Sequence, residues 1–144
     1  MQDLRIEAAS LAVQELYHAA VAARENSYSP YSHFAVGAAV RTAVGKIYGG
    51  CNIENASYGL CCCGERNAIF AAVGAGERQL TALCVVADTS APVSPCGACR
   101  QVMTETENRF GKPMKVLLCS AQEVFVIESA KDLLPVSFGS EDLK

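Results

Sequence analysis

Cys63-Gly64-Glu65-Arg66 and Pro95-Cys96-Gly97-Ala98-Cys99-Arg100 are the two stretches from which the fold and the chemistry of this chain can be worked out. Each opens a predicted helix: the first runs through Val73 and ends at the glycines of 74–76, and the second ends near Gly111. Three thiolates supplied by two helix starts are soft ligands that suit a zinc ion with one coordination position left for water. This pattern is typical of a catalytic metal site.

The segments on either side of these helices predict the rest of the fold. Apolar runs and a tight turn near Val44-Gly45 predict about five strands, at 34–40, 46–49, 80–87, 115–119 and 124–127. A helical repeat of apolar residues predicts an opening helix from position 3 to about position 25; its members are Ile6, Ala9, Val13, Leu16 and Ala20. Strands that alternate with helices imply an α/β fold of three layers, α/β/α, with helices on the faces of a mixed sheet of about five strands.

Length and composition favour a single domain over residues 1–144. With 51% hydrophobic and 19% charged residues, the chain is apolar for its size, which favours surface buried between subunits. The net charge of -3 and the absence of a Lys/Arg cluster argue against a nucleic-acid partner. The sequence shows no long apolar run of the kind that predicts a signal peptide or a membrane span. We therefore expect a cytoplasmic protein with no membrane partner.

Eight cysteines without an export signal favour metal binding or burial over disulfides. Cys84 and Cys119 lie in apolar runs and are predicted to be small core residues. Two alternatives to the three-thiolate site remain open. One is a closed four-thiolate zinc site completed by a further cysteine, for which the candidates are Cys51, Cys61 and Cys62. The other is a redox pair formed by Cys96 and Cys99.

Glu65 follows Cys63 by two positions and is not needed as a ligand. Such a carboxylate can take a proton from water bound to the metal and deliver it elsewhere. Three thiolates make the ligand set negative, and we expect the positive ends of two helix dipoles, with Arg66 or Arg100, to offset that charge. Once the charge is partly balanced, zinc can lower the pKa of its bound water towards about 7.

At this point the sequence resembles a family, the homotetrameric cytidine deaminases of the pyrimidine-salvage type. The zinc motif itself matches the general layout of zinc nucleobase deaminases, a Glu close after a Cys or His ligand and then Pro-Cys-x-x-Cys. Gly64 departs from the family, which usually has alanine there. The resemblance covers nearly the whole chain, through Tyr28-Ser29-Pro30-Tyr31-Ser32, Phe34 with 36–40, Asn52-Ile53-Glu54-Asn55-Ala56-Ser57-Tyr58, 63–66, 95–102, Leu133-Leu134-Pro135 and Phe138-Gly139.

The resemblance implies a cytidine deaminase-like fold, one zinc ion per subunit and a homotetramer whose sites are shared between subunits. It implies hydrolytic deamination of cytidine and 2′-deoxycytidine, in which hydroxide on zinc attacks C4 of the base and Glu65 shuttles protons. The implied substrate contacts are Asn52 and Glu54 at the ribose hydroxyls, Phe34 against the base or sugar, backbone at Gly64 near the base, and Phe138 reaching a neighbouring subunit's site. The implied zinc ligands are Cys63, Cys96 and Cys99.

Two other functions remain open from the sequence. A blasticidin-type deaminase would share the zinc and glutamate core, and a non-catalytic, zinc-stabilised assembly module would keep the metal without turning over a nucleoside. The intact Glu65 favours an enzyme. Without the resemblance, Phe34 and Phe138 would be read as core residues.

Overall fold

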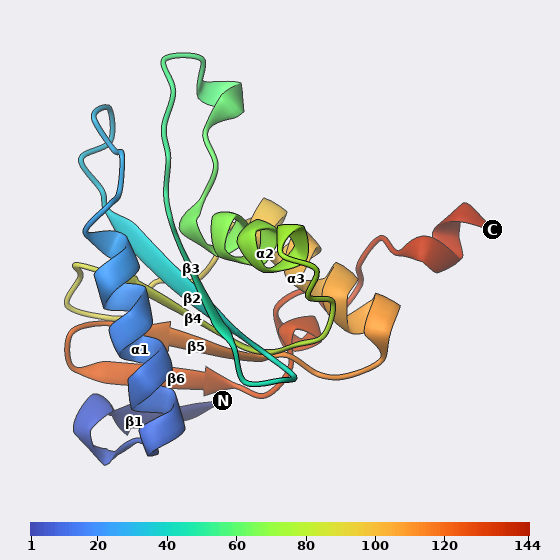
Figure 1. The fold of residues 1–144 in the computed structure, drawn as a ribbon, viewed down its shortest axis with the longest axis horizontal. Helices are drawn as coiled ribbons and strands as arrows, with labels where there is room; N and C mark the ends of the chain where they lie inside the picture. The colour runs from blue at the N-terminus through green and yellow to red at the C-terminus, as the bar shows by residue number, and fades with distance from the viewer.

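The computed structural model describes residues 1–144 and contains one six-stranded mixed sheet (Figure 1). Its strands lie in the order β1-β6-β5-β4-β2-β3, and only the neighbours β4 and β5 run parallel. The strands are β1 (Gln2–Arg5), β2 (Val36–Thr42), β3 (Ile47–Cys51), β4 (Leu80–Ala87), β5 (Lys115–Cys119) and β6 (Glu123–Ile127). The helices are α1 (Leu11–Arg24), α2 (Gly64–Gly74) and α3 (Gly97–Phe110), with short 3-10 turns η1 (Ile6–Ala8), η2 (Tyr58–Leu60), η3 (Ala130–Leu133) and η4 (Ser140–Leu143). None of the helices combines the length and the apolar character needed to cross a bilayer.

The sheet is covered on both faces, which confirms the predicted three-layer arrangement. Alternate residues of each central strand enter different cores, because successive side chains of a strand point to opposite faces. In β4, Leu83 and Val85 pack with α2 and α3, whereas Cys84 and Val86 pack with α1. Cys84 and Cys119 are both fully buried, as predicted for small core residues.

The first ten residues differ from the prediction of a helix starting near position 3. Gln2–Arg5 forms β1, which pairs antiparallel with β6 and raises the strand count from about five to six. The helix α1 starts only at Leu11, because Ser10 is extended and its hydroxyl accepts a hydrogen bond from the backbone N–H of Val13 at 3.3 Å. Leu4 packs in the same core as α1, so its apolar character fitted the helical pattern equally well.

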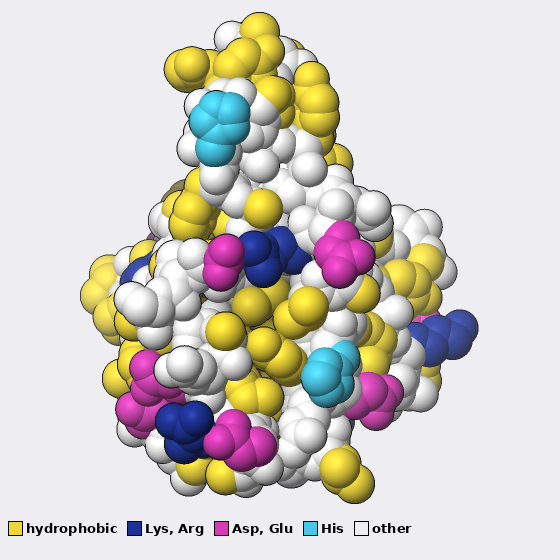
Figure 2. All heavy atoms as spheres, turned by 90° about the vertical axis from the view of Figure 1, so that its left-hand side faces the viewer, with side chains coloured by type: hydrophobic (Ala, Val, Ile, Leu, Met, Phe, Trp, Pro, Cys, Tyr) yellow, Lys and Arg dark blue, Asp and Glu magenta, His cyan; other side chains and the backbone are white.

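Two connections project together from the body at the top of Figure 1, and we call residues 25–35 and 52–63 the arm. The two segments are joined by a bridge between Tyr28 and Ile53, and Glu54 N–H donates to the Tyr28 carbonyl at 2.8 Å. Figure 2 shows hydrophobic side chains gathered over this projecting part. The exposed large hydrophobic residues of the arm are Tyr28, Tyr31, Phe34, Ile53, Tyr58 and Leu60.

The position of α2 depends on a close approach to β3. A Cβ atom on Gly50 would lie 2.3 Å from the backbone nitrogen of Ala68 in α2, a distance that no side chain could tolerate. Glycine at position 50 therefore lets the helix lie directly on the edge strand. This contact fixes the distance between the sheet and the start of α2, at Cys63 and Gly64.

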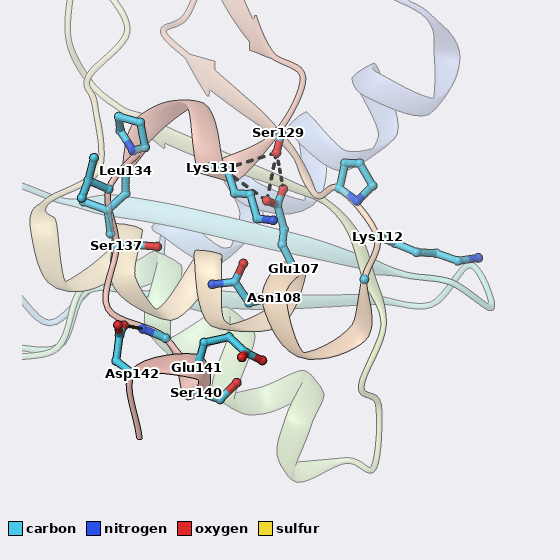
Figure 3. A pocket seen from close by; sticks show the side chains of 15 residues that line it. Glu107, Asn108, Lys112, Ser129, Lys131, Leu134, Ser137, Ser140, Glu141 and Asp142 are labelled. Carbon is cyan, nitrogen blue, oxygen red and sulfur yellow. Dashed lines mark hydrogen bonds between the residues drawn. The ribbon is translucent and has the colours of Figure 1, made fainter. Parts of the chain in front are cut away.

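Glu107 in α3 ties together the segments that surround the second half of that helix (Figure 3). The side chain is 3% exposed, and its Oε1 accepts hydrogen bonds from the backbone N–H groups of Met114 and Ala130, both at 2.7 Å. The N–H of Lys131 and the hydroxyl of Ser129 also donate to the carboxylate, at 3.2 and 2.8 Å. A buried carboxylate is tolerated here because neighbouring donors satisfy it.

We predict that Glu107→Ala lowers the free energy of unfolding by at least about 2 kcal/mol, because it leaves two buried backbone N–H groups without an acceptor. Urea denaturation at a fixed protein concentration measures this change. The matched control is Glu105→Ala, on the exposed side of the same helix, which should change stability by less than about 0.5 kcal/mol. Equal losses of stability in the two variants would contradict the stabilising role of the Glu107 carboxylate.

Candidate active site

Three cysteine thiols meet where two helices begin. Cys63 immediately precedes α2, Cys96 immediately precedes α3, and Cys99 lies in the first turn of α3. Their Sγ atoms all lie within 4.8 Å of one another, and the Sγ atoms of Cys63 and Cys96 are 3.7 Å apart. Two thiolates bound at about 2.3 Å to a tetrahedral zinc ion would be separated by about 3.8 Å. The donor set and its spacing therefore fit zinc.

The surroundings of this cluster favour thiolates. Both helices present the positive ends of their dipoles, and Arg66 Nη2 donates a hydrogen bond to Cys63 Sγ at 3.4 Å. Hydrogen bonding with the Cys99 thiol lowers the pKa of Cys63 most, and the hydrogen bond from Arg66 lowers it further. The resulting pKa is about 5. The same contact with Cys63 raises the pKa of Cys99.

The two arginines considered from the sequence have different places. Arg66 contacts a thiol, whereas the guanidinium of Arg100 donates to the Pro95 carbonyl at 2.8 Å and to the Ser94 hydroxyl at 2.6 Å. Charge compensation therefore falls to Arg66, and Arg100 fixes the backbone that leads to Cys96.

The remaining cysteines near the site do not join the cluster. The thiol of Cys61 accepts a hydrogen bond from the backbone N–H of Asn55 at 3.3 Å. Burial raises the pKa of the Cys51 and Cys62 thiols, which favours their neutral form. Since the ligand atoms that lie together are those of three cysteines, the geometry supports the open site and not the closed four-thiolate alternative.

Glu65 points its carboxyl group into the buried region beside the cluster. It lies in the first turn of α2, and the residue is only 4% exposed. Burial raises the pKa of this carboxyl group, while a contact with the Cys99 thiol acts in the opposite direction. A carboxyl group whose pKa is raised is suited to both accepting and releasing a proton near neutral pH.

Asn52 holds the two segments of the arm together. Its Oδ1 accepts hydrogen bonds from the Val36 N–H at 2.9 Å and from the Ser27 hydroxyl, and its Nδ2 donates to the Phe34 carbonyl at 2.7 Å. The amide carries two N–H groups, so one donor is left over from these contacts. Asn52 is therefore chiefly an organiser of the loop, with one N–H free for a ligand.

Glu54, two positions further along, also bonds to the first segment of the arm. Its Oε1 accepts from the N–H groups of Tyr31 and Ser32, both at 3.0 Å, and its Oε2 accepts from the Ser32 hydroxyl. Hydrogen bonds from Ser32 lower the pKa of Glu54, so the carboxylate is ionised at neutral pH. A carboxylate offers about four lone-pair positions, and one on Oε2 is left over. Glu54 lines a cavity of about 280 Å³ with Tyr31, Ser32, Tyr58 and Cys61.

The two candidate phenylalanines lie on the surface, and the alternative reading of both as core residues is wrong. Phe34 is 42% exposed and Phe138 is 59% exposed. Gly64 lies at the helix start, where an added Cβ would be 3.3 Å from the backbone of Cys51 and from the carbonyl oxygen of Val36. Alanine would require shifts of a few tenths of an ångström, so glycine permits a slightly closer approach of the helix start to the sheet.

Residues 11–110 match the family model of the cytidine and deoxycytidylate deaminase zinc-binding region. A cytidine deaminase of Sporosarcina psychrophila is 48% identical over 91% of this chain and 94% of its own length, and one of Halalkalibacterium halodurans is 48% identical over 90% and 96%. The crystal structure of the cytidine deaminase from Burkholderia pseudomallei superposes with a TM-score of 0.80 at 53% identity, covering 87% of this chain and 98% of that one.

This chain belongs to the cytidine and deoxycytidylate deaminase family. The predictions of an enzyme of this family, of its fold and of a zinc cofactor are therefore confirmed.

In this deaminase the sequence missed the side chains that hold the candidate substrate residues. Ser27 and Ser32 bond Asn52 and Glu54, yet the sequence offered only the turn-rich composition of the segment that contains them. Their partners lie more than 20 positions away along the chain, so no local pattern identifies the pairing.

We predict that alkylation of Cys63 in the metal-free deaminase rises with pH through a midpoint near 5, because the thiolate is the reactive form. In Arg66→Gln the midpoint should move upward, since the variant loses a cation beside the thiolate. Iodoacetamide labelling followed by peptide mass spectrometry measures the rate at Cys63. Arg109→Gln removes an exposed charge at the far end of α3 and should leave the midpoint unchanged; an equal midpoint in wild type and Arg66→Gln would refute the role of Arg66.

Proposed function

We propose that this chain hydrolyses cytidine and 2′-deoxycytidine to uridine and 2′-deoxyuridine with release of ammonia, a reaction of pyrimidine salvage. The observation that supports this most directly is the meeting of three thiols and the buried Glu65 at two helix starts, in a member of this deaminase family. The relatives reported above are named cytidine deaminases.

In the proposed reaction Glu65 moves the protons. Cys63, Cys96 and Cys99 hold zinc, which when bound supplies a Lewis acid that activates water as the nucleophile. Glu65 accepts a proton as the water adds to C4 and delivers it to N3 of the ring. It then takes the proton of the new C4 hydroxyl and passes it to the amine, which leaves as ammonia as the C4–N bond breaks and the C4 carbonyl forms. Water and cytidine are thereby converted to uridine and ammonia with no net change in protons. The backbone at Gly64 lies beside this site and is proposed to line the base pocket.

Asn52 and Glu54 are proposed to bind the ribose hydroxyls through the capacity left over from their loop contacts. One N–H of Asn52 can donate, and one lone pair on Oε2 of Glu54 can accept. Because the lowered pKa of Glu54 keeps its carboxylate ionised, its negative charge is proposed to repel a phosphate group and to favour a nucleoside over a nucleotide.

We further propose a homotetramer in which Phe34 packs on the substrate of its own subunit and Phe138 reaches that of a neighbour. The exposed hydrophobic residues of the arm and the exposure of both phenylalanines support this assembly, because apolar surface of this kind is typical of protein interfaces. The proposed partners are thus the nucleoside substrate and further copies of the chain, with no nucleic acid or membrane. The cytoplasmic location stays a prediction.

We predict that zinc-loaded wild-type protein removes the absorbance of cytidine, and that Glu65→Gln lowers kcat by at least about 100-fold because it removes the group that transfers protons. Zinc content should be the same in both proteins, since Glu65 is not a ligand. Glu105→Gln, on the exposed side of α3, is the control and should keep the wild-type rate.

A panel of cytidine, 2′-deoxycytidine and blasticidin S separates the alternatives to this function. Turnover of the antibiotic in place of cytidine would identify a blasticidin-type deaminase. Zinc binding with no turnover of any compound would identify a non-catalytic assembly module, and an unimpaired Glu65→Gln would rule out the mechanism.

We predict that Glu54→Gln narrows the preference for cytidine over cytidine 5′-monophosphate severalfold, because it removes the negative charge that disfavours a phosphate. The ratio of kcat/KM for the two compounds measures the effect and cancels general losses of activity. Glu25→Gln removes an exposed carboxylate at the base of the arm and should leave the ratio unchanged. The same ratio in Glu54→Gln and wild type would show that the charge of Glu54 does not exclude a phosphate.

A further inference from the structure

The C-terminal segment, residues 134–144, runs along α3 without being packed into the body. None of its residues is buried; Val136 is 93% exposed and Phe138 is 59% exposed. The segment leads away from the sheet to the C-terminus in Figure 1. Apolar burial therefore contributes little to fixing its position.

A hollow separates much of this segment from α3 (Figure 3). The cavity has a volume of about 660 Å³ and is lined mainly by polar residues of the helix end and of the segment itself, among them Asn108, Ser137 and Asp142. Because water can fill a polar cavity of this size, the cavity does not hold the segment in one place.

Hydrogen bonds from two consecutive residues of α3 supply the missing attachment. Arg100 Nη1 donates to the Leu133 carbonyl at 2.8 Å, where the segment begins. Gln101 Nε2 donates to the Phe138 carbonyl at 2.9 Å. This second bond is the only hydrogen bond that joins residues 135–144 to the rest of the chain. The other hydrogen bonds made by residues 135–144, such as that from Gly139 N–H to Asp142 Oδ2 at 2.8 Å, are internal.

These two residues follow directly after Cys99. Arg100 also holds the backbone before Cys96 through the Pro95 carbonyl, so a single guanidinium links the start of α3 to the start of the segment. Gln101 then fixes the peptide group of the one exposed aromatic residue in the segment. The first turns of α3 thus define where Phe138 stands.

We propose that Gln101 is a positioning residue that holds Phe138 in place through its carbonyl group, with Arg100 fixing the start of the segment. The proposal rests on the proposed function in one respect: Phe138 is taken to close the nucleoside site of a neighbouring subunit. Gln101 itself touches neither substrate nor metal in this role. It lowers the number of positions open to Phe138 before the nucleoside binds, and so lowers KM.

The first test is proteolysis at the Phe138–Gly139 bond of the full-length, zinc-loaded protein. Gln101→Met keeps the shape of the side chain and removes the N–H donor, and chymotrypsin should cleave after Phe138 about two- to tenfold faster because the segment opens more often. Cleavage after Tyr58, an exposed aromatic residue on the arm, should be unchanged.

Gln14→Met is the matched control. Gln14 also donates from Nε2 to a backbone carbonyl, that of Ala9, at 2.9 Å, and it is likewise part-buried on a helix. This variant should leave cleavage after Phe138 at the wild-type rate. If Gln101→Met and wild type were cleaved after Phe138 at the same rate, the proposal would be overturned.

The second test is kinetic. Gln101→Met should raise KM for cytidine about two- to tenfold with little change in kcat. It should add no further increase in a Phe138→Ala background, because without the ring there is no substrate contact left for Gln101 to position. An equal KM increase in both backgrounds would overturn the positioning role. Wild-type protein without turnover would overturn the proposed function instead, and proteolysis would still decide whether Gln101 holds the segment.

Discussion

The structure depends on balancing negative charge where three thiols converge. The three Sγ atoms lie within 4.8 Å of one another, and as zinc ligands they would be thiolates, which repel one another unless positive charge is supplied. The starts of α2 and α3 supply partial charges, and Arg66 supplies a full one against Cys63. Because the compensation comes from the backbone of two helices, the chemistry of the site is tied to the fold itself.

Close packing then sets where this balanced cluster lies. Gly50 lets α2 rest on β3, and Gly64 lets the first residue of the helix approach the backbone of Cys51. Small residues at these points bring Glu65 into a region where water is largely excluded, and this burial raises the pKa of its carboxyl group. The two glycines thus affect the site by allowing a short distance between α2 and the sheet, and they take no part in its chemistry.

Polar side chains organise the parts of the chain that lie outside the sheet. Asn52 joins the two segments of the arm, and Glu107 gathers the backbone around the end of α3. Gln101 attaches the C-terminal segment through the Phe138 carbonyl. In each case the partner is mostly a backbone group of a loop that has no regular ladder of its own, so a single side chain supplies the hydrogen bond that the loop lacks. Of these three residues, Asn52 is also proposed to bind the ribose, and Gln101 is proposed to position Phe138.

By itself the sequence determined the local features. The helix starts at Cys63 and Cys96, the strand at 80–87 and the pairing of a zinc motif with Glu65 follow from composition and spacing, since each is encoded within a few neighbouring residues. Tertiary structure decided what depends on distant partners. Residues 2–5 became a strand because β6 was available to pair with them, and Arg66 was selected over Arg100 because only its guanidinium reaches a thiol. The exposure of Phe34 and Phe138 and the attachment of the C-terminal segment by Gln101 were likewise settled in three dimensions, because burial and hydrogen bonding depend on which segments meet, and a one-dimensional pattern does not record that.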